Sequence, residues 1–245
     1  MADAQPSIHQ AGSVVAREVA RFDALAAEWW DLSGPMRALH AMNPLRVGWI
    51  DRRVRARRGG PMRLLDIGCG AGLAAEAFAR LGHDVLGLDA AVDAIAAAKA
   101  HAAGRKLPLA YRAGAAEDLV AEGARFPVVT ALEVIEHVSD PADFLRLLAQ
   151  MIEPGGLLFV STLNRTLRSL AVAKLGAEYV LRLLPVGTHE WRRFVTPAEL
   201  GAHGKAAGFR MADVSGMVFD LRSRQWRAGT DLAVNYIAML ERKYS

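Results

Sequence analysis

Three glycines at alternate positions and two carboxylates form the pattern in this chain that is best suited to chemistry. Gly68, Gly70 and Gly72 come directly after an apolar run that contains Asp66, and a run with helical periodicity follows them. Glycine lets the backbone turn tightly and approach a ligand where a side chain would collide. A second apolar run ends in Asp89, so two strand ends can face one nucleoside. The pattern therefore predicts a cofactor site.

The spacing of the glycines narrows the class of cofactor. In a dinucleotide site the third glycine comes three residues after the second, and here Leu73 occupies that place. The observed spacing resembles motif I of the class I S-adenosylmethionine-dependent methyltransferases. This resemblance implies that the loop lies against the methionine part of the cofactor. It also implies that Asp89 holds the ribose hydroxyls.

Glu133, Glu136 and His137 form a second group with chemical potential, directly after a predicted strand. On a helical turn these positions share one face, so we expect the three side chains to reach one point. Two carboxylates and an imidazole suit a divalent cation such as Mg²⁺, and the imidazole would equally suit a transition metal. A metal there could bind catechol oxygens and favour the phenolate. Two other interpretations stay open. In one, the three residues only cap the following helix or bind substrate. In the other, His137 removes the phenolic proton as a general base.

The length and composition of the chain limit the surrounding architecture. A length of 245 residues fits one α/β domain with appendages. One cysteine excludes an internal disulfide, and a formal charge of +4 does not call for a nucleic-acid partner. No apolar run reaches the roughly 18 residues that span a bilayer, and the N-terminus has no secretory signal pattern. We expect a cytoplasmic protein that is soluble or peripheral to a membrane.

Apolar runs alternate with helical runs along most of the chain, which predicts a doubly wound, mostly parallel α/β sheet. Ligands of such sheets bind at the carboxyl ends of the strands. Helices are predicted at 13–31 and 45–58, so that residues 1–60 form an N-terminal helical extension and residues 61–245 the methyltransferase domain. The predicted strands are 62–67, 84–89, 107–112, 126–132 and 155–162, with helices near 72–81, 91–103 and 140–151. The segments 209–214, 217–222 and 230–239 are predicted to close the sheet as antiparallel strands.

Several longer strings resemble the ubiquinone-biosynthesis O-methyltransferase family, over about residues 15–240. They are Phe22-Asp23-x-Leu25-Ala26-x-x-Trp29-Trp30-Asp31, Asn43-Pro44-Leu45-Arg46, Glu133-Val134-Ile135-Glu136-His137-Val138, Ser161-Thr162-Leu163-Asn164-Arg165 and Gly187-Thr188-His189-Glu190. The resemblance implies a seven-stranded Rossmann-like sheet. It also implies methylation of two polyprenylated intermediates, a 2-polyprenyl-6-hydroxyphenol and 3-demethylubiquinol.

The same resemblance assigns roles to individual residues. Cofactor contacts fall on Arg46, Gly68, Asp89 and Leu132, together with the other glycines of the loop, and Arg46 is expected to meet the cofactor carboxylate. Glu133, Glu136 and His137 match the family's proposed Mg²⁺ ligands. Asn164 and His189 are expected near the substrate. Trp29 and Trp30 are expected to pin the N-terminal helix to the core, or to line the substrate path.

A helical insertion at about 164–190 is expected to meet a membrane. On a helical projection of residues 167–184, apolar side chains fill one broad arc and charged side chains the other. Such a segment can lie in the interface of an anionic bilayer, which favours peripheral attachment to the inner face of the cytoplasmic membrane. Membership of a ubiquinone-biosynthesis complex is a further hypothesis.

Two other functions compete with this interpretation. One is a methyltransferase of another small lipophilic substrate, and the other is a cofactor-binding scaffold subunit without catalysis. A nucleic-acid methyltransferase is disfavoured, because the fourth strand ends in Glu-Val-Ile-Glu-His. Amino-methylating relatives have an Asn/Asp-Pro-Pro-aromatic string there.

Overall fold

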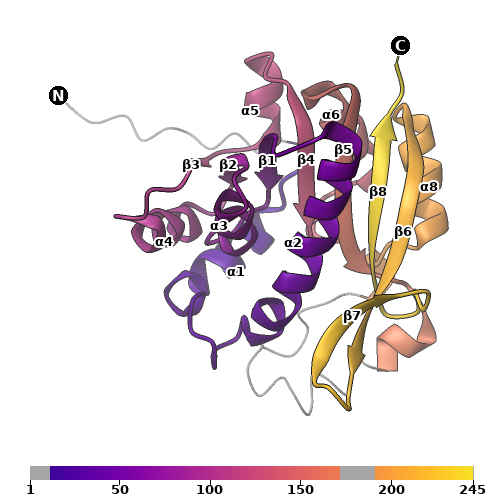
Figure 1. Ribbon diagram of the computed structural model, residues 1–245, viewed down its shortest axis with the longest axis horizontal. Helices are drawn as coiled ribbons and strands as arrows, with labels where there is room; N and C mark the ends of the chain where they lie inside the picture. The colour runs from indigo at the N-terminus through magenta and orange to yellow at the C-terminus, as the bar shows by residue number, and fades with distance from the viewer. Residues whose placement is uncertain (1–11, 172–190, 245) are drawn as a thin grey trace.

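A single mixed sheet forms the centre of the molecule (Figure 1). The computed structural model describes residues 12–171 and 191–244. The strand order is β3-β2-β1-β4-β5-β8-β6-β7. The first five strands of this order are parallel, whereas β8 runs antiparallel to both β5 and β6. The strands are β1 (Arg63–Ile67), β2 (Asp84–Asp89), β3 (Leu109–Ala113), β4 (Phe126–Leu132), β5 (Ile152–Leu163), β6 (Phe209–Asp220), β7 (Gln225–Gly229) and β8 (Asn235–Arg242).

The doubly wound, mostly parallel sheet is confirmed, but it has eight strands where seven were expected. The segments predicted as two strands at 209–214 and 217–222 are one strand, β6. Gly216 lies inside it, and a Cβ atom there would come 1.9 Å from the carbonyl oxygen of Asp231. The glycine therefore marks a close backbone approach and not a break between strands. The chain turns only after Asp220, and β7 pairs with β6 as the additional strand.

The helices lie on both faces of the sheet. They are α1 (Ala16–Ala24), α2 (Arg37–Arg58), α3 (Leu73–Arg80), α4 (Val92–Ala102), α5 (Ala116–Ala121), α6 (Pro141–Met151) and α8 (Pro197–Ala206), with the short 3₁₀ helices η1 (Ala26–Glu28) and η2 (Trp191–Arg193). Residues of α2 and α3 pack against one face, and those of α5, α6 and α8 against the other.

Helix α2 begins earlier than predicted and contains Pro44 in its interior. An internal proline costs about 3 kcal/mol, which is why the sequence predicted a helix start after it. Trp49, Ile50 and Val54 of this helix are almost completely inaccessible. Each such side chain stabilises the fold by roughly 1.5–3 kcal/mol on burial, so packing offsets the cost of the proline. The predicted N-terminal extension thus contributes to the core of the sheet (Figure 1).

The expected helical insertion lies largely outside the described residues. Residues 167–171 are helical, and residues 172–190 are not described. Among the described helices, none is both long and apolar enough to cross a membrane.

Candidate active site

A cavity of about 780 Å³ lies at the carboxyl ends of the parallel strands. Its inner wall includes the glycine loop and the ends of β1, β2 and β4. Its outer wall includes one stripe of α1, formed by Val15, Val19, Phe22 and Leu25. None of the residues of α1 is fully buried, because this stripe faces the cavity and not a solid core. The sequence predicted the stripe, and the structure shows what it covers.

The glycine loop has the close packing that its composition predicted. Gly68, Gly70 and Gly72 all have positive φ angles, of 67°, 53° and 87°. A Cβ atom on Gly70 would come 2.2 Å from the indole ring of Trp29. Trp30 lies alongside, and its Nε1–H donates to the carbonyl oxygen of Ala71 at 3.0 Å. The two tryptophans therefore attach the N-terminal segment to the loop, as the packing interpretation predicted, and Trp29 also lines the cavity, as the alternative predicted.

Asp89 holds the glycine loop in place from the end of β2. Its Oδ2 accepts from the Gly70 backbone N–H at 2.7 Å, and its Oδ1 accepts from that of Ala91 at 2.8 Å. Burial raises the pKa of this carboxyl, and the two backbone donors oppose the shift. Each carboxylate oxygen has a second lone pair, so Asp89 can also accept from a ligand's hydroxyl groups.

Two other polar groups of the loop region are buried against the cavity. The Asp66 Oδ1 accepts from the Thr130 hydroxyl at 2.6 Å, and its Oδ2 has no hydrogen-bond partner among the described residues. Burial raises the pKa of Asp66 to about 6. Burial also raises the pKa of the Cys69 thiol, which keeps it neutral. Cys69 therefore acts as a small filler.

Arg46 extends from α2 into the same cavity, where Leu132 also contributes to the lining. The residue is 3% exposed, and its Nη1 lies 3.7 Å from the Glu133 Oε1. Its Nε has no hydrogen-bond partner within the described part of the chain. A buried guanidinium with an unused donor suits a carboxylate ligand.

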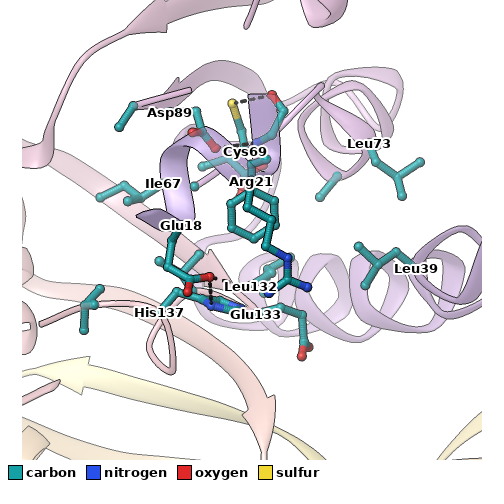
Figure 2. A pocket seen from close by; sticks show the side chains of 18 of the residues that line it. Glu18, Arg21, Leu39, Ile67, Cys69, Leu73, Asp89, Leu132, Glu133 and His137 are labelled. Atoms are coloured by element: carbon teal, nitrogen blue, oxygen red, sulfur yellow. Dashed lines mark hydrogen bonds and ion pairs between the residues drawn. The ribbon is translucent and has the colours of Figure 1, made fainter. Parts of the chain in front are cut away.

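Glu133, Glu136 and His137 do not converge on one point, contrary to the expectation from helical spacing. The segment after β4 is a turn and not a helix, and Glu133 has a φ angle of 57°. Glu133 accepts from the Ser161 hydroxyl at 2.6 Å, and Glu136 from that of Thr162 at 2.8 Å. Figure 2 shows His137 turned toward Glu18, away from the Glu133 carboxylate.

These three side chains, as arranged, do not fit a metal ion. Among the described residues, no group of three His, Cys, Asp or Glu side chains is placed to hold one. Burial and the neighbouring Glu133 raise the pKa of Glu136 to about 8, and its carboxylate accepts from Thr162, away from the other two side chains. We therefore derive no step through a metal.

Glu18 is a site residue that the sequence did not indicate. It extends from α1, and its Oε2 lies 2.9 Å from the His137 Nδ1 (Figure 2). Burial lowers the pKa of His137, and Glu18 opposes that shift. Only the apolar stripe of α1 was visible in the sequence, because a glutamate on an amphipathic helix carries no local signal of a partner 119 positions away in the chain.

Of the two predicted substrate residues, the structure describes Asn164 but not His189. Asn164 is buried, and its Nδ2 donates to the carbonyl oxygen of Leu232 at 2.8 Å. It is absent from the lining of the cavity, so the structure gives it the role of a tie between β5 and the segment before β8. His189 lies outside the described residues.

The far end of the cavity is apolar and was not predicted. It is lined by Met42, Leu163, Leu170, Trp191, Trp226 and Val234. Asn235, at the start of β8, is a polar residue of this end. The cavity therefore joins a charged end, beside the glycine loop, to an apolar end beside β7 and β8.

Comparison with known proteins identifies the family to which the chain belongs. Residues 40–214 match the family model described as a methyltransferase domain. The ubiquinone biosynthesis O-methyltransferase of Azorhizobium caulinodans is 50% identical over 230 residues, which cover 89% of this chain and 90% of the relative. The chain belongs to the ubiquinone biosynthesis O-methyltransferase family. The member from Caulobacter vibrioides is 46% identical over 235 residues, with 92% and 93% of the two chains covered.

Solved structures of methyltransferases share the fold. The magnesium protoporphyrin IX methyltransferase of Synechocystis PCC 6803, solved with bound S-adenosylhomocysteine, superposes with a TM-score of 0.65 at 19% identity. It covers 92% of this chain and is itself covered completely. A methyltransferase from Thermotoga maritima superposes with a TM-score of 0.63 at 17% identity, with 91% of this chain and 98% of that chain covered. As a family member, the protein is an O-methyltransferase that uses S-adenosylmethionine.

Proposed function

We propose that this enzyme transfers a methyl group to phenolic hydroxyls of polyprenylated catechol and quinol intermediates, at both O-methylation steps of ubiquinone biosynthesis. One observation supports this most directly. The cavity joins the glycine loop and Asp89 to a chamber lined by apolar side chains. A prenylated aromatic ring has the matching composition, with oxygens at one end and hydrocarbon at the other.

Site residues at the charged end are proposed to hold the cofactor. Gly68 and Gly70 line the cavity and let its methionine part lie against the backbone, and Asp89 accepts from its ribose hydroxyls. Gly72 is absent from the lining, packs against Tyr111 and is proposed to shape the loop. Arg46 is proposed to bind its carboxylate, since the Nε–H is an unused donor among the described residues. Leu132 supplies an apolar surface for the adenine.

His137 is proposed to remove the phenolic proton. A proton on Nδ1, which faces Glu18 at 2.9 Å, leaves Nε2 as the basic nitrogen. The lowered pKa of His137 keeps the ring neutral and able to accept a proton at neutral pH. The phenolate oxygen then attacks the sulfonium methyl, the carbon–sulfur bond breaks, and S-adenosylhomocysteine leaves. Glu133 is proposed to shape this end of the cavity beside Arg46. Glu136 is absent from the lining and is proposed to support the turn from behind, through the Thr162 hydroxyl.

A lipophilic acceptor favours peripheral attachment to the inner face of the cytoplasmic membrane. We retain the amphipathic segment 167–184 as the proposed attachment element, although most of it lies outside the described residues. Co-sedimentation with anionic liposomes tests this. Leu181→Glu with Leu184→Glu should abolish it, and unchanged co-sedimentation would reject the assignment.

The substrate proposal is tested by one purified preparation with labelled S-adenosylmethionine. We expect methylation of both the prenylated hydroxyphenol and the demethylated quinol. Label on a different lipophilic acceptor, but on neither of these, would favour a different substrate, and no transfer to any acceptor would favour a scaffold role.

A chelator should leave the rate unchanged, because the three candidate metal ligands each contact a different partner. A loss of activity that Mg²⁺ restores would show that Glu133, Glu136 and His137 rearrange around a metal.

A further inference from the structure

Two buried asparagines near the apolar end of the cavity have the same unusual feature. Asn164 is 8% exposed and Asn235 is 9% exposed. In each, the Oδ1 has no hydrogen-bond partner within the described part of the chain. A buried acceptor without a partner is unfavourable, so each such atom requires an explanation.

The two asparagines differ in their hydrogen bonds and in their position relative to the cavity. The Asn164 amide is fixed by its hydrogen bond to the carbonyl oxygen of Leu232, and the residue does not line the cavity. Asn235 does line the cavity. Its Nδ2 lies 3.8 Å from the Met42 Sδ, which is a weak acceptor, so its Oδ1 is an acceptor available to a ligand.

The sheet places Asn235 at the same edge as the proposed chemistry. The Glu133 N–H donates to the carbonyl oxygen of Ser161 on β5 at 2.9 Å, and Leu163 of β5 lies in register with Asn235 of β8. Asn235 therefore stands two strands from the turn that contains Glu133 and His137. Two strand spacings are about 10 Å, a distance that two side chains and one aromatic ring can bridge.

We propose that the Asn235 Oδ1 accepts a hydrogen bond from the second hydroxyl group of the acceptor, the one that is not being methylated. This inference rests on the proposed function and makes Asn235 a determinant of specificity for dihydroxylated rings. An acceptor without the second hydroxyl leaves the buried oxygen unpaired. Loss of a buried hydrogen-bond partner lowers affinity by about ten- to a hundredfold.

The test measures affinity without turnover, in the full-length enzyme saturated with S-adenosylhomocysteine. The two probes are a prenylated catechol and the prenylated phenol that lacks its second hydroxyl. The wild type should bind the catechol about ten- to a hundredfold more tightly. Asn235→Leu, of similar volume, should bind both probes with nearly equal affinity. Asn235→Ser provides a second variant with the same expected loss of preference, should the leucine variant fail to fold.

Asn164→Leu is the matched control, since it removes an equally buried amide outside the cavity. It should lower stability and leave the preference for the catechol intact. The proposal is overturned if the wild type shows no preference, or if Asn235→Leu keeps it. Either result leaves the proposed function standing when the wild type still methylates the prenylated catechol, whereas absence of that methylation rejects the proposed function itself.

Discussion

The two ends of the cavity are built in different ways. The centre of the cofactor end comes from short segments that follow one another along the chain, where β1 leads into the glycine loop and β2 ends in Asp89, and α2 and β4 add Arg46 and Leu132 to it. The acceptor end is assembled from elements far apart in sequence, including α1, the turn after β4, η2, β7 and β8. Local segments can be recognised by spacing alone, whereas an assembled surface exists only in the folded chain. The two ends should therefore respond separately to substitution.

The largest expected effect separates chemistry from cofactor binding. His137→Ala should lower kcat by about a hundredfold or more, since general acid–base catalysis contributes about 10²–10⁴. The dissociation constant of S-adenosylmethionine should stay the same. In the wild type the rate should fall only below the ordinary pKa of histidine, because burial lowers the pKa of His137. Steady-state kinetics across pH, with calorimetry, measures both quantities. A variant with wild-type turnover would remove His137 from the mechanism.

The cofactor end is tested by Gly70→Ala. The added Cβ would come 2.2 Å from Trp29 at a φ angle of 53°, so the loop or the indole ring must move. We expect the affinity for S-adenosylmethionine to fall by about tenfold or more, the equivalent of 1.4 kcal/mol. Gly104→Ala is the control, because Gly104 has a φ angle of 75° and no atom within 4 Å of the added Cβ. Equal losses of affinity in both variants would show that backbone strain alone is responsible.

A smaller effect is expected at the apolar end. Trp226 lines the cavity, and its ring lies 5.5 Å from that of Phe219, directly opposite on β6. Trp226→Ala should raise KM for a prenylated acceptor by about tenfold, because apolar contact with the tail is lost. KM for the same ring without a tail should change little. Leu221→Ala serves as the control, since Leu221 is 83% exposed. A KM increase of the same size for both acceptors would place Trp226 against the ring and not the tail.

The last expected effect concerns stability and not catalysis or binding. The pKa of Glu136 is raised to about 8 in the folded protein from 4.5, so the folded state holds this proton more tightly than the unfolded state. The stabilisation of the folded state by this protonated carboxyl is complete below about pH 4.5 and is lost as the pH rises through about 8. Over that range the free energy of unfolding falls by at most about 1.4 kcal/mol per pH unit. Denaturant unfolding of the wild type should show this decline, and Glu136→Gln should reduce it. If the free energy of unfolding falls equally steeply with pH in the wild type and in Glu136→Gln, another titrating group is responsible.

The contrast between the ends also explains how far the sequence could predict the molecule. The parallel strands, the glycine loop and Asp89 were predictable because the apolar runs, and the glycines and acids at their ends, are visible within a few residues of the sequence. The helical turn assumed for Glu133, Glu136 and His137 was wrong, because Glu133 adopts a left-handed backbone conformation. The metal assignment itself stays a prediction, which the chelator experiment tests. Asn164 was chosen as a substrate residue from a family string, which carries no information on the hydrogen bond that its amide makes to Leu232, outside the lining of the cavity. The proposed roles of Glu18 and Asn235 depend on His137 and on the cavity, which lie close to them only in the folded chain.

The separation of a cofactor end from an acceptor end is tested most directly by calorimetric titration of S-adenosylmethionine into the wild type, Asp89→Ala and Asn235→Leu. We predict equal affinity for the wild type and Asn235→Leu. Asp89→Ala should bind at least about tenfold more weakly, because it loses its hydrogen bonds to the Gly70 and Ala91 amides and to the ribose. No heat from the folded wild type, or an equal loss in the two variants, would contradict the account.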